Sequence, residues 1–179
     1  MFAKVENNQV VAANSSKDFF KGSTGIYEVI YDTANLKDTE FYYNGAETFT
    51  FANDQVIASY APATAKPLED RNEVNKDGTP LLDRDGKQVV TKGLKSNHVA
   101  RIKSQAASLL QSTDWYIIRN AESGASIPAN ISTYRAAVRT KSNDMEALIN
   151  AVSSVEQLAA LYVYDKDTKS RPLGDFPRL

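Results

Sequence analysis

The residue types that most often carry catalysis or bind metals are scarce in this chain. His98 is the one histidine, and there is no cysteine. Zinc sites built from several histidine and cysteine ligands are therefore excluded within one copy. A Ser–His–Asp triad would need His98 beside a serine in a strained turn, and no Gly-x-Ser-x-Gly sequence occurs. We expect His98 to be a partly exposed residue near the start of a helix.

Two acidic stretches, residues 73–78 and 83–86, resemble calcium-binding loops at first sight. A loop that began at Glu73 would place Arg84 at the twelfth position, where a bidentate Glu is required. The second stretch has Leu81 where the first acidic ligand should stand. We interpret both as turns, because each contains the Asp-Gly pair that turns favour.

Carboxylates in the first part of the chain are the remaining candidates for catalysis. A glycosidase needs two of them facing each other across a cleft. We expect these residues to lie on solvated strand faces instead: Glu28, Asp32, Glu40 and Glu47. There is also no glycine-rich phosphate loop. The sequence therefore predicts no enzyme and no cofactor or metal site.

Tyrosines in the first sixty residues have two interpretations. The residues concerned are Tyr27, Tyr31, Tyr42 and Tyr43. Half-buried tyrosines are common in strands, and this is the simpler interpretation. The alternative is a surface for a glycan or a partner protein.

The near-neutral charge of the chain bears on whether it binds nucleic acid or membranes. It has 21 basic and 22 acidic residues and a net charge of −1. No strong field favours nucleic acid or an anionic membrane. No stretch of about 20 apolar residues is present, and the first residues lack the apolar core of a signal peptide. We expect neither nucleic acid nor a membrane as a partner.

Hydrophobic patterning divides the chain into four parts and predicts an α+β fold. Residues 1–60 alternate in short runs, which indicates a small antiparallel β module, a meander or sandwich. Residues 61–93 form a connector, with a possible hairpin around Asp85-Gly86. Residues 94–162 are helical, with three to five short helices, and residues 163–179 form an extended tail.

Turn residues suggest how the β module is joined. Asn44-Gly45 predicts a tight hairpin between residues 41–43 and 48–51, and Asn53-Asp54 predicts the next turn. Phe49 and Phe51 should lie on the buried face.

Apolar residues at helical spacing define the first helix, which we expect to be capped by Ser96 or Asn97. Its buried face comprises Val99, Ile102, Ala106, Leu109 and Leu110. A second helix should end at Gly124, a third should carry Pro128 in its first turn, and a fourth should span residues 143–152. Ser154 and Gln157 allow a capping box, and Phe176 and Leu179 are apolar residues of the tail that could dock.

A motif links the first three helices. Thr113 or Asp114 should cap the second helix, while Trp115 should fold back onto the leucine pair Leu109 and Leu110 as the largest buried residue. Arg135 and Arg139 share one face of the third helix, where they could reach Asp114 or Glu122. These spacings indicate a folding motif, and a direct binding surface is the alternative.

The same residues resemble a known family. Leu109 to Trp115, then Ile127-Pro128, then Tyr134-Arg135 and Arg139 are similar to the phage tail assembly chaperone family, and related segments occur in tail-fibre and other tail-associated proteins. The resemblance covers residues 97–140, about a quarter of the chain. Many members continue directly into a Phe-Pro ending, whereas here Phe176-Pro177 comes much later.

This resemblance implies a role in the tail of a tailed bacteriophage. The expected function is that of a non-enzymatic structural protein of a fibre, baseplate or adaptor, made in the host cytoplasm and located in the virion. Its partners would be other tail proteins, in an oligomeric assembly. One alternative is a fibre-assembly chaperone that does not stay in the virion, and another is a carbohydrate-binding module that uses the tyrosines.

Overall fold

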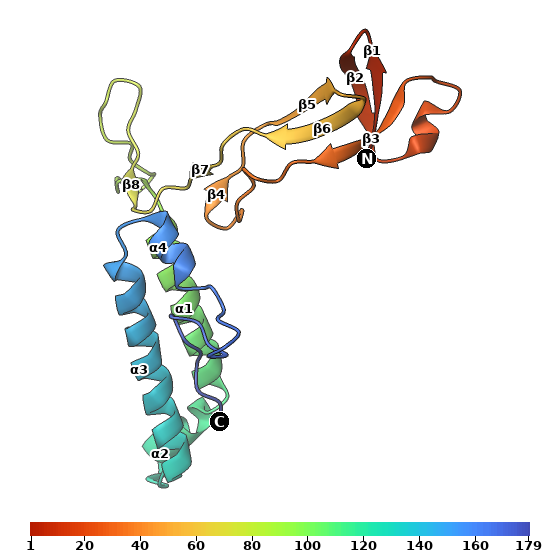
Figure 1. The fold of residues 1–179 in the computed structure, drawn as a ribbon. Helices are drawn as coiled ribbons and strands as arrows, with labels where there is room; N and C mark the ends of the chain where they lie inside the picture. Colours follow the sequence, from red (N-terminus) through yellow and green to blue (C-terminus); the bar gives the residue numbers. More distant parts are fainter. The chain divides into compact units, whose positions relative to one another are not determined.

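The computed structural model describes residues 1–179, and the chain forms two compact units. The strand unit is Met1–Lys66, and the helical unit is Pro67–Leu179. The α+β fold class is confirmed, since the five-stranded sheet and the four α-helices lie in different units (Figure 1). Residues 67–93 belong to the same compact unit as the helices.

The strand unit is built on one curled, mixed sheet. Its elements are β1 (Phe2–Glu6), β2 (Gln9–Asn14), a 3-10 helix η1 (Lys17–Phe20), β3 (Ile26–Tyr31), β4 (Tyr42–Tyr43), β5 (Glu47–Ala52), β6 (Gln55–Tyr60) and β7 (Thr64–Ala65). The strand order is β2-β1-β3-β6-β5, and β4 pairs with β7 separately. The edge strands β2 and β5 also approach each other, so the sheet curls around its core.

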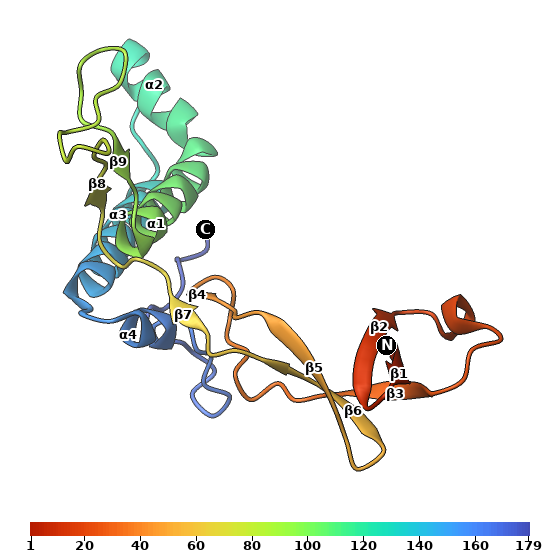
Figure 2. The same cartoon turned by 90° about the horizontal axis from the view of Figure 1, so that it is seen from above.

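The expectation of a purely antiparallel module is wrong at one pair of strands. β3 and β6 are parallel, with Val29 opposite Val56 (Figure 2). The chain leaves the sheet after Tyr31 and returns as the hairpin of β5 and β6, whose second arm runs in the same direction as β3. Because residues 32–46 separate β3 from this hairpin, no local sequence pattern could predict the pairing of β3 with β6.

The predicted Asn44-Gly45 hairpin is also wrong. Tyr42 and Tyr43 pair with β7, and the Asn44 side chain bonds to both backbone groups of Lys37. A Cβ on Gly45 would collide with the backbone of Ala61, so the glycine serves a close approach of two chain segments. Gly45, which we interpreted as a turn residue, is therefore required by the close packing of its backbone against Ala61.

The predicted turn at Asn53-Asp54 is confirmed. Both residues have positive φ, at 51° and 56°, and they join β5 to β6. Asn7 and Asn8, which were not predicted as a turn, join β1 to β2 in the same way. Paired asparagine or aspartate residues tolerate this conformation, which fits the twist of a tight hairpin.

The core of the strand unit lies on the inner face of the curled sheet. Four small side chains are buried at its centre: Ala3, Val29, Val56 and Ala58. Phe49 and Phe51 pack against them and are partly buried, as expected, together with Tyr27. Small central residues leave room for aromatic rings from the neighbouring strands.

The helical unit has a long helical pair as its frame. Its elements are β8 (Arg71–Asn72), β9 (Val90–Thr91), α1 (Leu94–Gln111), α2 (Asp114–Ser123), α3 (Ala129–Ala151) and α4 (Val155–Ala160). α1 and α3 pack side by side, with α2 at the turn between them (Figure 1). The two helices expected around Val138 and residues 143–152 are one helix. No glycine or proline interrupts α3, and Ser142 continues its buried stripe from Val138 to Met145.

The ends of the helices follow local rules only in part. Gly124, with φ of 70°, ends α2 as predicted, and Ser154 accepts the Gln157 N–H at the start of α4. The Gln157 amide oxygen returns to the Ser153 N–H, one residue before a standard capping box.

Ser96 and Asn97 do not cap α1. The helix begins earlier, at Leu94, because the Leu94 and Lys95 N–H groups donate to the carbonyls of Pro67 and Leu68. A distant segment therefore satisfies the free N–H groups of the first turn.

The C-terminal tail docks through two of its residues. Leu173 is fully buried, and its N–H donates to the carbonyl of Leu161. Phe176 packs against the cluster around Ala106, as expected for a docked tail. Leu179 is exposed, so the expected docking of that residue is wrong.

Leu173→Ala tests this docking. The change should lower the free energy of unfolding of the helical unit by about 2–5 kcal/mol, because it leaves a cavity at a fully buried position. Urea melts followed by circular dichroism at 222 nm measure it. Leu179→Ala is the matched control and should change stability by less than about 0.5 kcal/mol. Equal effects of the two changes would contradict the docked tail.

Candidate interaction site

One buried arginine organises the corner where α1, α2 and α3 meet. Arg135 of α3 donates from Nη1 to the Leu110 carbonyl at 2.8 Å and to Thr113 Oγ1 at 2.6 Å. Its Nη2 pairs with Asp114 Oδ1 at 2.8 Å. The predicted pairing of this arginine with Asp114 is confirmed. The guanidinium joins the end of α1, the turn and the start of α2, and so sets the direction in which α2 leaves.

Thr113 and Asp114 do not provide the predicted side-chain cap. Thr113 is buried, and its hydroxyl donates to the Leu110 carbonyl while it accepts from Arg135. Asp114 lies in the first turn of α2, where a carboxylate also interacts favourably with the helix dipole. Pro128 stands immediately before α3 and not within its first turn.

Trp115 does not fold back onto the leucine pair, and the expected burial is wrong. It is 49% exposed, with its ring centroid 3.8 Å from that of Tyr116 and 5.6 Å from the Arg119 guanidinium. Leu109 and Leu110 pack instead on Tyr134, in the cluster that also receives Phe176. The tail therefore supplies Phe176 as the aromatic residue beside Leu109 and Leu110, where Trp115 was expected.

The consequence is an ordered helix without a buried face. No residue of α2 is buried, and we call its three large apolar residues, Trp115, Ile117 and Ile118, the α2 surface. Ile118 is 56% exposed and Ile117 is also exposed. Single exposed apolar residues are ordinary, but here Trp115 and Ile118 lie three positions apart on one side of a fixed helix, and Ile117 adds an exposed apolar side chain on another side. Exposed apolar residues gathered on one ordered helix are typical of a contact surface.

Tyr134 and Arg139, the other residues of the motif, do not belong to the α2 surface. Tyr134 is buried in the α1–α3 core, whereas Arg139 is exposed and forms no ion pair. The arginine pair therefore separates into one structural residue and one surface residue.

The four tyrosines do not form one face. Tyr42 is buried, and Tyr27 packs with its ring centroid 4.8 Å from that of Phe51. Tyr31 and Tyr43 are exposed, and the Lys66 ammonium lies 5.3 Å from the Tyr43 ring centroid. Of the four tyrosines in the predicted partner or glycan surface, only Tyr31 and Tyr43 are thus exposed.

His98 is buried, so the expectation of partial exposure is wrong. It is 3% exposed, and its Nδ1 lies 2.6 Å from the Tyr162 hydroxyl and 2.8 Å from Arg101 Nη2. Because a guanidinium can only donate, Nδ1 acts as the acceptor of that bond. The histidine is thus engaged in a hydrogen-bond network of the helical unit.

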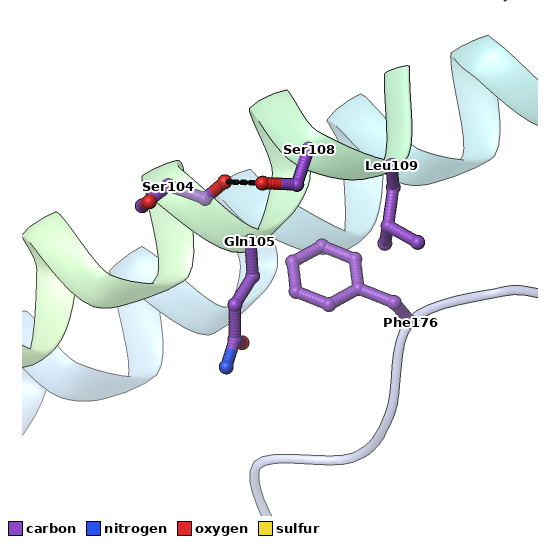
Figure 3. Close-up of a pocket in the computed structure, with 5 residues that line it drawn as sticks. All are labelled: Ser104, Gln105, Ser108, Leu109 and Phe176. Atoms are coloured by element: carbon purple, nitrogen blue, oxygen red, sulfur yellow. Dashed lines mark hydrogen bonds between the residues drawn. The ribbon is translucent and has the colours of Figure 1, made fainter. Parts of the chain in front are cut away.

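A shallow hollow lies where the tail crosses α1 (Figure 3). Phe176 and Leu109 form its apolar part, and three neutral polar residues complete it: Ser104, Gln105 and Ser108. The Ser108 hydroxyl donates to the Ser104 carbonyl of its own helix at 3.0 Å. The lining residues offer neither a charged group nor a paired nucleophile and base.

The structure contains no group of three or more His, Cys, Asp or Glu residues placed to hold a metal ion. The acidic stretches are turns, as predicted. Gly78 and Gly86 have positive φ, and the carboxylates of Asp77 and Asp83 accept hydrogen bonds within their own turns.

The two turns belong to one segment, residues 71–91, which we call the excursion. β8 and β9 pair at its base, and the hairpin predicted around Asp85-Gly86 is present, with Leu82 bridged to Gln88. Asp70 lies beside this base. It accepts from the Gly93 N–H at 2.9 Å and pairs with Lys92 Nζ at 2.7 Å. The Lys92 ammonium, Ser96 and the Gly93 N–H lower the pKa of the Asp70 carboxyl to about 2.

No helix in the structure combines the length and apolar character that crossing a bilayer requires. Comparison of the chain with protein-family models, with curated protein sequences and with solved structures found no match.

The Asp70 interaction predicts a pH dependence at the start of α1. A carboxyl with a lowered pKa stabilises the folded state above its unfolded value of 3.8, and this contribution is lost as the pH falls through about 2. NMR titration of the Asp70 carboxyl carbon should give a midpoint near the lower value, with the Gly93 amide shifting in parallel. Asp70→Asn should shift that amide already at neutral pH. A midpoint close to 3.8 would show that the interaction does not persist in solution.

Arg135→Ala tests the corner. We expect a loss of about 2–4 kcal/mol in the free energy of unfolding, because the Thr113 hydroxyl loses its donor, the Leu110 carbonyl loses one of its donors and Asp114 loses its ion-pair partner. Arg139→Ala, one turn further along the same helix, is the matched control and should cost less than about 0.5 kcal/mol. The measurement is a denaturant melt that follows the emission of Trp115, the one tryptophan of the chain. Similar losses for both variants would show that the arginine contacts do not hold the corner.

Proposed function

We propose that this chain is a non-enzymatic structural component of the tail of a tailed bacteriophage and that it acts through protein–protein contacts. The single observation that carries the contact function is the α2 surface. An ordered helix exposes Trp115, Ile117 and Ile118 and buries none of its own residues. Trp115 and Ile118, at i and i+3, lie on one side of α2, which is the spacing with which amphipathic helices insert into apolar grooves of partners, and Ile117 lies on another side.

The orientation of α2 is maintained by interactions outside the apolar residues. A helix of ten residues is marginal by itself in water. Here the Arg135 contacts hold its start, and Gly124 and the bond from Asn120 Nδ2 to the Ala125 carbonyl hold its end. The fold therefore keeps an apolar surface exposed in one fixed direction, and this preorganisation lowers the entropy lost on binding.

The assignment to a phage tail rests on the resemblance of residues 97–140. Four of the residues that carry the resemblance meet at the corner that positions α2, which supports a shared structural role for them: Leu110, Thr113, Asp114 and Arg135. The Phe-Pro pair supports the same proposal, since Phe176 is distant in the sequence yet packs in the cluster of Leu109 and Leu110. In this proposal the chain is made in the host cytoplasm and remains in the virion, bound to other tail proteins.

Two alternatives remain beside it. A fibre-assembly chaperone would use the same α2 surface but leave the finished virion. A carbohydrate-binding module would be of a different class and would depend on Tyr31 and Tyr43, the two exposed tyrosines of the original four.

Mass spectrometry of purified virions from phages that carry variant genes tests the proposal. The unaltered chain should be present, and Ile118→Asp should reduce its amount at least about tenfold, because a buried unpaired charge opposes binding. Val163→Asp alters an exposed apolar residue outside α2 and should leave the amount unchanged. Both variants should fold, since each residue is exposed.

The remaining outcomes are also decisive. Absence of the unaltered chain from virions, with its presence in tail-assembly intermediates, would select the chaperone. Absence from both would overturn the phage-tail proposal. Normal incorporation of Ile118→Asp would remove α2 as the contact surface.

A further inference from the structure

The chain reverses its direction just before the docked part of the tail. Residues 164–170, which we call the hinge, are all exposed. The backbone groups of Asp165 and Ser170 exchange two hydrogen bonds, at 2.8 and 3.3 Å, and the Asp165 carboxylate accepts from the N–H groups of Asp167 and Thr168. These bonds all lie within the hinge, so opening the hinge breaks no hydrogen bond of a helix.

One residue of the hinge has a strained backbone. Lys169 has a φ of 51°, in the left-handed region, where the Cβ of an L-residue lies too close to a carbonyl oxygen. Its N–H donates no hydrogen bond that would compensate for the strain. An extended chain has negative φ at every residue. Opening the hinge into an extended segment therefore relieves the strain at Lys169.

Residues 171–176, which we call the hook, keep their shape through bonds of their own. The Gly174 N–H donates to the Arg171 carbonyl at 2.8 Å. The Arg171 guanidinium donates in return to the Gly174 carbonyl at 3.1 Å, and it pairs with Asp175 at 2.7 Å. The shape of the hook is therefore set within the hook and not by the helices that receive it.

The helical unit holds the hook through two apolar side chains and one backbone hydrogen bond. Leu173 is fully buried, and its N–H donates to the Leu161 carbonyl at 3.0 Å. Phe176 joins the cluster that includes Leu109 and Leu110, and Figure 3 shows its ring beside Leu109 at the hollow. The hook of a second copy offers the same two side chains and the same N–H group.

We propose that two copies of this chain exchange their hooks, so that the hook of each copy docks on the helical unit of the other. Every contact of the docked hook recurs in the exchanged dimer, and only the hinge changes, from reversed to extended. Seven extended residues span about 23 Å, which gives the hook its reach toward a second copy. The exchange is reciprocal, so association stops at a dimer.

Concentration decides between the two arrangements. A short tether holds the hook near its own helices at an effective concentration of about 1 mM. The left-handed conformation of Lys169 lowers that value by about tenfold, because the hinge must adopt it to return the hook. We therefore expect a monomer in dilute solution and an exchanged dimer in the range between about 0.1 mM and about 1 mM.

Substitutions at Lys169 test the role of the hinge. Proline cannot adopt a positive φ, so Lys169→Pro should dimerise at concentrations at least about tenfold lower than the unaltered chain. Glycine adopts it without strain, so Lys169→Gly should need concentrations about tenfold higher. Lys169→Ala removes the charge but keeps the strain, and as the matched control it should dimerise like the unaltered chain. Sedimentation velocity from about 1 µM to about 1 mM gives the midpoints.

A nuclear Overhauser effect between two differently labelled copies identifies the contact itself. One preparation carries methyl protons on leucine only, the other carries ring protons on phenylalanine only, and both are otherwise deuterated. After the two are mixed in urea and refolded together at about 1 mM, a cross-peak should join the Leu109 methyl groups to the Phe176 ring. Phe176→Leu in the second preparation should remove that cross-peak.

Several results would overturn the exchange of hooks: an unaltered chain that stays monomeric up to about 1 mM, equal midpoints for the proline and glycine variants, or a dimer without the cross-peak. Ile118→Asp alters α2 and should leave the midpoint unchanged. Loss of the dimer in that variant would show that copies associate through α2 instead. Because the hook contact does not include the α2 surface, failure of the exchange would leave the proposed function intact, and loss of α2 as a contact surface would leave the exchange intact.

Discussion

The helical unit depends on the buried guanidinium of Arg135. A buried charge is tolerated only when it is paired and hydrogen-bonded, and this one has three acceptors from the end of α1 and the start of α2. Its Nε atom remains without a partner, so every other contact of the group is needed. The requirement to satisfy this side chain sets the geometry of the corner, and the direction of α2 follows from it.

At this corner, the residues that stabilise the core are different from the apolar residues that α2 exposes. Leu109 and Leu110 are covered in a cluster that Phe176 joins, so the core of the unit does not need Trp115. The tryptophan is then available on a helix whose position is set by polar contacts. Because α2 buries none of its residues, its apolar side chains contribute little to the stability of the unit.

The strand unit shows how the same local signals lead to different structures in different contexts. Asn53-Asp54 forms the hairpin turn that its composition predicts, because the two strands beside it have matching lengths and faces. Asn44-Gly45 has an equally favourable composition, yet Tyr42 and Tyr43 pair with β7. Gly45 is needed there because the backbone of Ala61 passes too close for any side chain.

The sequence by itself determined the α+β class, the spacing of the buried face of α1, the Gly124 helix end and the Ser154 cap. Each depends on groups within a few residues or on a spacing that one helix imposes. Only the tertiary structure decided that β3 and β6 are parallel, that His98 is buried and that Phe176 occupies the place expected for Trp115. Those outcomes depend on which of several distant segments reaches a site with the better fit, and this competition leaves no local pattern.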